Sequence, residues 1–375
     1  IVPRSGIPPI LNNWRENLFG YCILVIGYLL FGRVGVTMFI SDSKIKGSIL
    51  LLALWSLSLL TVFSVTLGYG LRQKLSLVKR IDERDRLSLI AEAGVKKALA
   101  ELIRQETEGC NSLKDPVSND PALFKDVHLE GGSFSVSYNF MNEPEDALET
   151  RYGLSDEESK INFNTAGLAV LKNLFAAFGL DEVEAQELAA SIVDWRDKDS
   201  QLSIPLGSAE DPYYHGLPYP YEAKDSEFES LDELLLVKGM TPEMLEKLKD
   251  YVTVSSGGRI NINTASSLVL LSLGLDEDTA DKIIRHRSAD DGILGNEDDN
   301  VFIKTSDIVP QVSQAFPLSD SQISKLTIVV DQGLDVYSNN FMIQSTARLN
   351  NRKAELKVVC IADIFGKIMY WQEGI

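Results

Sequence analysis

The sequence has few of the residues on which metalloenzymes, thiol enzymes and disulfide-stabilised proteins depend. Three cysteines and three histidines occur among 375 residues, with neither a CxxC pair nor an HxxxH spacing. Zinc centres and thiol redox sites draw on closely spaced cysteines and histidines, and a Ser/His/Asp triad needs a histidine. Phosphate-cradling glycine loops are absent from the sequence as well. The composition therefore predicts a protein that is not an enzyme.

Basic residues are also scarce. The chain has 36 lysines and arginines against 54 aspartates and glutamates, which gives a formal charge of −18. A negative field of this kind repels phosphate backbones and attracts cations such as Ca²⁺. We therefore expect that nucleic acid is not a partner.

The cysteines offer one candidate disulfide. Cys110 and Cys360 could pair in an oxidising compartment. The sequence gives no distance between them, so two unlinked thiols are the alternative.

One long hydrophobic run is the clearest positive feature. Residues 48–69 pass without a charge over roughly the length that spans the hydrocarbon core of a bilayer. A short polar and basic run, residues 41–47, precedes it and ends at Gly47. A secretory signal would carry its small residues after the apolar region, so we predict an anchor that the mature protein keeps.

A second apolar stretch, residues 18–40, is interrupted by Arg33 and would form a helical hairpin with the first. Because the sequence does not begin with methionine, we expect translation to start at Met38, which gives a leader of residues 38–47. Residues 1–37 are then a misassigned upstream segment, or else an extra hydrophobic span. A peptide from that segment in the unprocessed protein would contradict this start site.

The remaining pattern predicts an α+β fold. After the anchor the sequence stays helical to about residue 107, without proline and with Leu89, Ala98 and Leu102 on one apolar face. We expect this long N-terminal helix to lie on a small antiparallel sheet, with a large mainly α-helical domain inserted in it. The sheet domain comprises residues 108–160 and 336–375, and the insertion comprises residues 161–335. Alternating apolar and polar residues predict strands at 131–140, 341–349, 354–365 and 367–374.

The insertion contains an internal repeat. INFNTA at residues 161–166 and ININTA at residues 260–265 each precede an apolar helix, a glycine turn and a second helix. Asparagine and threonine favour the N-cap position. The predicted N-caps are Asn164 or Thr165 in the first unit and Asn263 or Thr264 in the second.

These units resemble helix-hairpin-helix modules, which in DNA-binding proteins hold phosphates through backbone amides supported by lysine or arginine. The turns are acidic here and would repel a phosphate. We therefore predict that the helices are a packing scaffold, with a membrane-anchored DNA receptor of the competence type as the alternative. The acidic residues at the turns are Asp181, Glu182, Asp276, Glu277 and Asp278.

The order of these features resembles a known family. A glycine directly before a retained apolar helix resembles the leader of type IV prepilins and places the cut between Gly47 and Ser48. The glutamate usual at the fifth mature position is replaced by Leu52, a departure known from the K-type minor pseudopilin. From Lys46 onward the motifs INFNTA, SIVDWRDKDS, GSAEDPYY, PYPYEAKDSEF and ININTA closely resemble general secretion pathway protein K.

That resemblance implies a minor pseudopilin at the tip of the type II secretion pseudopilus, where it caps the fibre and helps to initiate its assembly. The implied partners are the I- and J-type minor pseudopilins, prepilin peptidase and the inner membrane, with the head in the periplasm. A minor pilin of a type IV pilus would share the leader and the sheet. The large insertion favours the secretion protein.

Two acidic loops of the insertion are candidate Ca²⁺ sites, because Ca²⁺ prefers several oxygen ligands. Members of the family bind calcium in this domain, so the resemblance implies one or two ions. It assigns Asp197, Asp199, Glu210 and Asp211 as ligands, with Asp194 and Glu222 as weaker candidates. The composition of the second loop adds Asp290, Asp291 and Asp298 as weaker candidates. The second loop lacks the EF-hand register. The alternatives are a solvated, helix-capping segment for the first loop and a charged turn for the second.

Overall fold

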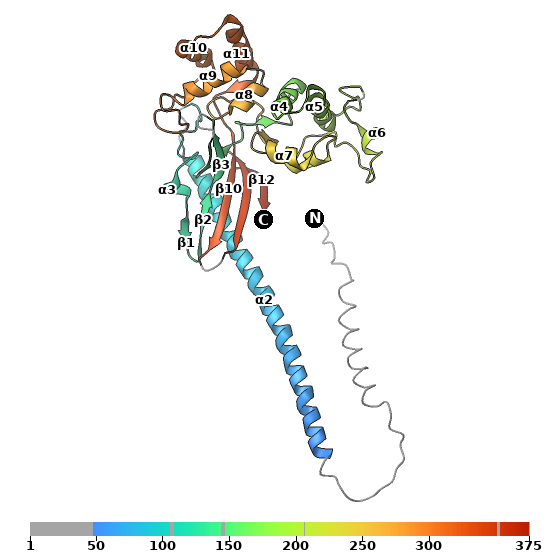
Figure 1. The fold of residues 1–375 in the computed structure, drawn as a ribbon. Helices are drawn as coiled ribbons and strands as arrows, with labels where there is room; N and C mark the ends of the chain where they lie inside the picture. Colours follow the sequence, from blue (N-terminus) through green and yellow to red (C-terminus); the bar gives the residue numbers. More distant parts are fainter. Residues whose placement is uncertain (1–47, 106–108, 144–146, 206, 351–352, 375) are drawn as a thin grey trace, which may run out of the picture. The chain divides into compact units, whose positions relative to one another are not determined.

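The computed structural model describes residues 48–105, 109–143, 147–205, 207–350 and 353–374 (Figure 1). The predicted leader and the segment before it lie outside the described residues. The chain divides into two units, Ile1–Ser76 and Leu77–Ile375. The second unit is called the head below.

One long helix, α2, begins at Ser48 and ends at Arg104. Among the described residues it is the one helix long and apolar enough to cross a membrane. Within its apolar part, the hydroxyls of Ser56, Ser58 and Thr61 donate to carbonyl oxygens three residues earlier, at 2.8–2.9 Å. These hydroxyls therefore need no water, as the interior of a bilayer requires.

In the head, the C-terminal part of α2 packs tightly against a sheet. A Cβ at Gly94 would clash with Ser345 Oγ, so glycine permits the close approach. The predicted apolar face is confirmed at Ala98 and Leu102, which are buried, and is wrong at Leu89, which is 65% exposed. Each residue turns the helix by about 100°, so Leu89 points away from its buried neighbours. Those neighbours are Leu87, Ile90, Ala91 and Val95.

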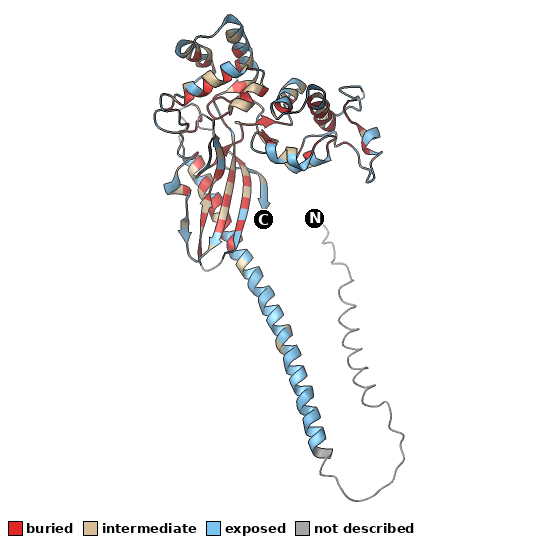
Figure 2. Cartoon of the chain, in the orientation of Figure 1, coloured by how far each residue is buried: buried red, intermediate tan, exposed pale blue. Residues whose placement is uncertain are grey.

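The sheet joins strands from both ends of the head in the order β1-β2-β10-β11-β12, all antiparallel, with β5 pairing beside β10. Burial alternates along β10, so one face of the sheet covers α2 (Figure 2). The predicted terminal strands are confirmed. The first predicted strand breaks at Ser137, after which β3 pairs with β4 instead. The strands are β1 (Val127–Leu129), β2 (Gly132–Val136), β3 (Tyr138–Asn142), β4 (Ala147–Arg151), β5 (Ser155–Asp156), β10 (Asn340–Leu349), β11 (Glu355–Asp363) and β12 (Ile368–Glu373).

The predicted α+β fold with an inserted, mainly helical domain is confirmed. Two groups of helices, α4–α7 and α8–α11, share one hydrophobic core that includes Phe163, Trp195 and Phe302. A short helix, α3 (Pro121–Phe124), precedes the sheet. The helices of the insertion are α4 (Leu168–Ala177), α5 (Glu182–Arg196), α6 (Asp211–Tyr214), η2 (Leu231–Leu236), α7 (Pro242–Leu248), α8 (Ser267–Ser272), α9 (Glu277–Arg287), α10 (Thr305–Ala315) and α11 (Asp320–Gly333).

The two repeats fold alike, each beginning with a two-residue strand that pairs in parallel: β6 (Ile161–Asn162) with β7 (Val252–Thr253), and β8 (Ile260–Asn261) with β9 (Leu334–Asp335). The predicted N-caps are wrong, because α4 and α8 are capped by Gly167 and Ser266.

The asparagine of each repeat instead binds the backbone of a residue far along the chain. Asn164 accepts from the N–H of Phe228 at 2.7 Å and donates to its carbonyl at 3.0 Å. Asn263 makes the same two bonds to Phe302, both at 2.9 Å. A side-chain amide has a donor and an acceptor. The two bonds to one backbone residue use both groups, whereas an N-cap uses only the acceptor.

The candidate disulfide between Cys110 and Cys360 is not formed. Cys360 has a free thiol and is buried between α2 and the sheet, whereas Cys110 packs against the core of the insertion. The two side chains therefore belong to different hydrophobic clusters.

Three consecutive acidic residues join the insertion to the sheet. Asp156 is buried and accepts from Ser338 Oγ at 2.6 Å, and Glu158 accepts from the N–H of Asn340 at 2.9 Å. Glu157 pairs with Lys160 at 2.5 Å. Burial, followed by the charge of Asp156, raises the pKa of Glu158 to about 7.

This junction predicts a pH dependence of stability. Because the pKa of Glu158 is raised in the folded state, its contribution is fully present below the unfolded value of about 4.5 and is lost as pH rises to about 7. The loss is on the order of 3 kcal/mol. Denaturant unfolding of the head at pH 5 and pH 8 should show this fall, and Glu158→Gln should reduce it. A fall of equal size in the variant would contradict the assignment.

Candidate metal centre

Acidic side chains converge at the C-terminal end of α5. Asp194 lies in the last turn of the helix and is fully buried, and Asp197 is its C-cap. Glu210, directly before α6, is 3% exposed. The ring of Trp195 holds the two segments together, because it packs edge-on against Tyr214 at a centroid distance of 5.1 Å.

Several oxygen atoms of this cluster have no protein partner. Asp194 Oδ1 accepts from the Ser203 N–H at 3.0 Å, but Asp194 Oδ2, Asp197 Oδ1 and both carboxylate oxygens of Glu210 are buried without a hydrogen bond. Buried polar atoms are nearly always hydrogen-bonded, and a buried charge without a partner is costly. Four such oxygens in one cluster therefore fit a group that supplies positive charge.

The electrostatics of the cluster agree with this. Burial, and then the charges of Asp194 and Asp197, raise the pKa of Glu210 to about 7. Burial also raises the pKa of Asp197. The neighbouring cation is engaged elsewhere, since Arg196 donates to the carbonyl oxygens of Phe163 and Ala166.

One member of the cluster was missed by sequence reasoning. The charge of Asp225 contributes to the raised pKa values of both Glu210 and Asp197. Asp225 has a positive φ of 50° and donates its N–H to the carbonyl of Trp195 at 3.1 Å. Asp225 belongs to neither acidic loop. The tertiary packing around Trp195 places it beside the other carboxylates of the cluster.

The other candidates of the first loop lie toward the rim. Asp199 is exposed and accepts from the Gln201 N–H at 2.9 Å, and one oxygen of Asp211 accepts from Ala223 at the same distance. Glu222 lies 3.8 Å from His215. Over the described ranges, no three acidic, histidine or cysteine side chains converge closely enough to hold an ion by themselves. The acidic residues that act on one another most closely here are Asp194, Asp197 and Glu210, which have unpartnered buried oxygens, together with Asp225, whose charge acts on Asp197 and Glu210.

In the second acidic loop, basic side chains bind backbone carbonyl oxygens, while Asn296 Oδ1 and Asp299 Oδ1 are buried without a hydrogen bond. Lys114 Nζ donates to the carbonyl oxygens of Glu297 and Asp299 at 2.6 and 3.1 Å, and Arg151 donates to that of Leu294 at 2.5 Å. The buried carboxylate of Asp299 also feels the charge of Arg287. The weaker candidates Asp290, Asp291 and Asp298 are exposed along this loop.

The fold defines an α+β class of protein, in which one long helix lies on an antiparallel sheet that carries a helical insertion. Residues 148–257 match the family model of type II secretion system (T2SS) protein K. Two curated relatives are both called type II secretion system protein K. The protein of Aeromonas hydrophila is 35% identical over 127 residues, 32% of this chain and 37% of its own length. That of Pectobacterium carotovorum is 30% identical over 111 residues, 29% of this chain and 33% of its own.

The chain therefore spans about a third of the length of these relatives in the matched regions. A solved structure, the GspK–GspI–GspJ complex of enterotoxigenic Escherichia coli, contains a chain of similar fold. The TM-score is 0.58 at 20% identity, covering 80% of this chain and 99% of that one. Part of the chain is therefore similar to type II secretion system protein K, and the solved structure shows that the fold is shared.

Proposed function

We propose that this protein is a minor pseudopilin at the tip of the type II secretion pseudopilus. The observation that carries the proposal is the fold match, which extends over 99% of a chain solved in complex with GspI and GspJ. The corresponding I- and J-type pseudopilins are the proposed partners. Capping the fibre and initiating its assembly are the proposed tasks.

The proposal includes one anchor in the inner membrane and a head in the periplasm. Within the described residues helix α2 comprises Ser48–Arg104, and its first half is apolar. Leu52 lies on this half without the carboxylate that most pilins carry there, which suits a subunit with none ahead of it. We keep the division into leader 38–47, helix 48–107, sheet domain 108–160 and 336–375, and insertion 161–335.

We further propose that Ca²⁺ binds at the α5 cluster through Asp194, Asp197, Glu210 and Asp225. The unpartnered, buried oxygens of Asp194, Asp197 and Glu210 support this assignment, and the charge of the exposed Asp225 acts on Asp197 and Glu210. Ca²⁺ takes oxygen ligands in flexible geometry. When bound, the ion would neutralise the carboxylates and fix the loop between α5 and α6. Asp199 and Asp211, whose charges act on Asp197 and Glu210 respectively, are proposed as additional ligands. The cations around the second loop argue against an ion there.

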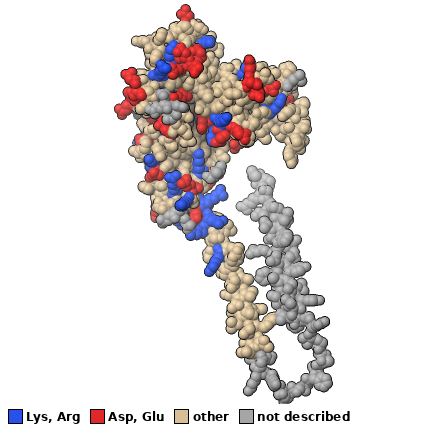
Figure 3. Space-filling model, viewed as in Figure 1, with Lys and Arg blue, Asp and Glu red and all other residues tan. Residues whose placement is uncertain are grey.

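The DNA-receptor alternative finds little support in the hairpins. The α4–α5 and α8–α9 turns pass through Gly179 and Gly274 with φ of 91° and 101°, but Asp181 and Asp276 cap the helices that follow. Figure 3 shows acidic side chains in several patches over the insertion. A gel-shift assay at low salt is expected to show no retained DNA.

Loss of the gene tests the proposed function. Deletion is expected to leave type II substrates in the periplasm, and the full chain supplied in trans should restore their export. A second arm measures DNA uptake in the same strain. Normal export with lost uptake would favour the receptor, and normal export and uptake would contradict both functions.

A further inference from the structure

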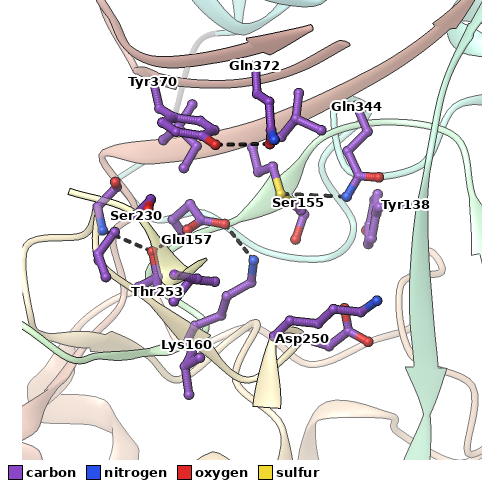
Figure 4. Close-up of a pocket in the computed structure, with 18 of the residues that line it drawn as sticks. Tyr138, Ser155, Glu157, Lys160, Ser230, Asp250, Thr253, Gln344, Tyr370 and Gln372 are labelled. Carbon is purple, nitrogen blue, oxygen red and sulfur yellow. Dashed lines mark hydrogen bonds and ion pairs between the residues drawn. The ribbon is translucent and has the colours of Figure 1, made fainter. Parts of the chain in front are cut away.

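A cleft of about 480 Å³ separates the solvent-facing side of the sheet from the insertion (Figure 4). Its floor is formed by side chains of β10, β11 and β12, and its opposite wall by α7 and the segment after it. Met342 to Thr346 spans about 13 Å along β10, and three strands are about 10 Å wide. The volume lies in the range of ligand sites, and the floor is long enough for about four extended residues.

The base of the cleft is fixed by a buried ion pair. Glu157 and Lys160 meet at 2.5 Å, and Thr253 also bonds to Glu157. Figure 4 shows this pair pointing toward each other below Gln344 and Tyr370. Glu157 and Lys160 neutralise each other. The polar groups that remain available to a ligand are therefore those on the sheet above this pair.

Three donor groups around the cleft are not fully used by the protein. Lys357 is exposed and makes no ion pair among the described residues, although the charges of Lys249 and Asp250 act on it. The amide nitrogen of Gln344 reaches only the sulfur of Met342, at 3.6 Å. Gln372 accepts from the Tyr370 hydroxyl at 2.9 Å, which leaves its own N–H groups available in the part of the chain that the structure describes.

The charged side chains around the cleft limit the chemistry of the ligand that it can bind. Lys249, on the opposite wall, is paired with Glu246, and Asp232 and Asp250 also line the cleft. A polyanion would meet these carboxylates, whereas a single carboxylate could reach Lys357. Amide side chains suit backbone N–H and C=O groups, because they donate and accept.

We propose that this cleft binds an extended segment of a partner protein that carries one carboxylate. The carboxylate meets Lys357, and the backbone of the segment meets Gln344 and Gln372. The inference goes beyond the proposed function and does not depend on the metal centre. It gives the head a site for a peptide segment separate from the helix α2.

The test uses the full chain in detergent micelles and a fluorescein-labelled pentapeptide with a central glutamate flanked by valines. Fluorescence anisotropy should show saturable binding. Replacing the glutamate by glutamine, or Lys357 by methionine, should weaken binding about tenfold, the value of one charge-assisted hydrogen bond. Gln344→Leu should weaken both peptides.

The matched control is Lys325→Met, an exposed lysine of α11 outside the cleft, which should leave binding unchanged. Melting curves of each variant verify folding. Equal binding of the two peptides, no saturable binding at millimolar protein, or an equal loss in Lys325→Met would overturn the proposal. Displacement of the peptide by equimolar free glutamate would indicate a site for small carboxylates and would also overturn it.

Discussion

Calcium added to the chelated head is expected to raise its unfolding free energy by about 3 kcal/mol when the free ion exceeds its dissociation constant roughly a hundredfold. The reason is that the folded loop gathers Asp194, Asp197 and Glu210 with unpartnered oxygens, and the unfolded chain does not. Differential scanning calorimetry in chelator and in millimolar calcium should show a rise of several degrees in melting temperature.

Glu210→Gln sharpens this prediction. The change removes a buried carboxylate that faces other carboxylates, so the chelated variant should melt above the chelated wild type while its response to calcium disappears. Asp298→Asn in the second acidic loop is the matched control and should keep the full response. A response that survives Glu210→Gln but is lost in Asp298→Asn would move the ion to the second loop.

Lys160→Met is expected to destabilise the head by roughly 3–5 kcal/mol, because it leaves the carboxylate of Glu157 buried without its cation. The side chains of Lys160 and Glu157 are 7% and 3% exposed, so water cannot replace the lost partner. Denaturant unfolding measures the change, with the midpoint falling at an unchanged slope.

Two variants separate this effect from a general loss of lysine. Lys160→Met combined with Glu157→Gln removes both charges and should recover much of the stability. Lys172→Met breaks an ion pair with Glu182, whose side chain is 82% exposed, and should change the stability far less than Lys160→Met. The assignment fails if Lys160→Met costs no more than Lys172→Met.

The sequence predicted the elements whose pattern is local. Alternation located β10, β11 and β12, and the charge-free run located the apolar half of α2. The face of α2 was harder, because its buried side is made of alanines and Gly94 as much as of leucines. Small residues carry little hydrophobic signal, although they allow the closest packing.

Features that depend on contacts between distant segments were not predicted. Asn164 and Asn263 matched a capping pattern, but their partners, Phe228 and Phe302, lie far along the chain. Asp225 joins the acidic cluster only through its backbone bond to Trp195. Most carboxylates of the acidic cluster could be predicted from the sequence, but which of them lie together is visible only in the tertiary structure.

Co-assembly most directly tests the central proposal, that this chain acts as a K-type minor pseudopilin. The full chain would be coexpressed with the I- and J-type pseudopilins of the same secretion system and purified through a tag on the J protein. We predict that all three chains elute as one complex. Recovery of an I–J pair that leaves this chain behind would contradict the account.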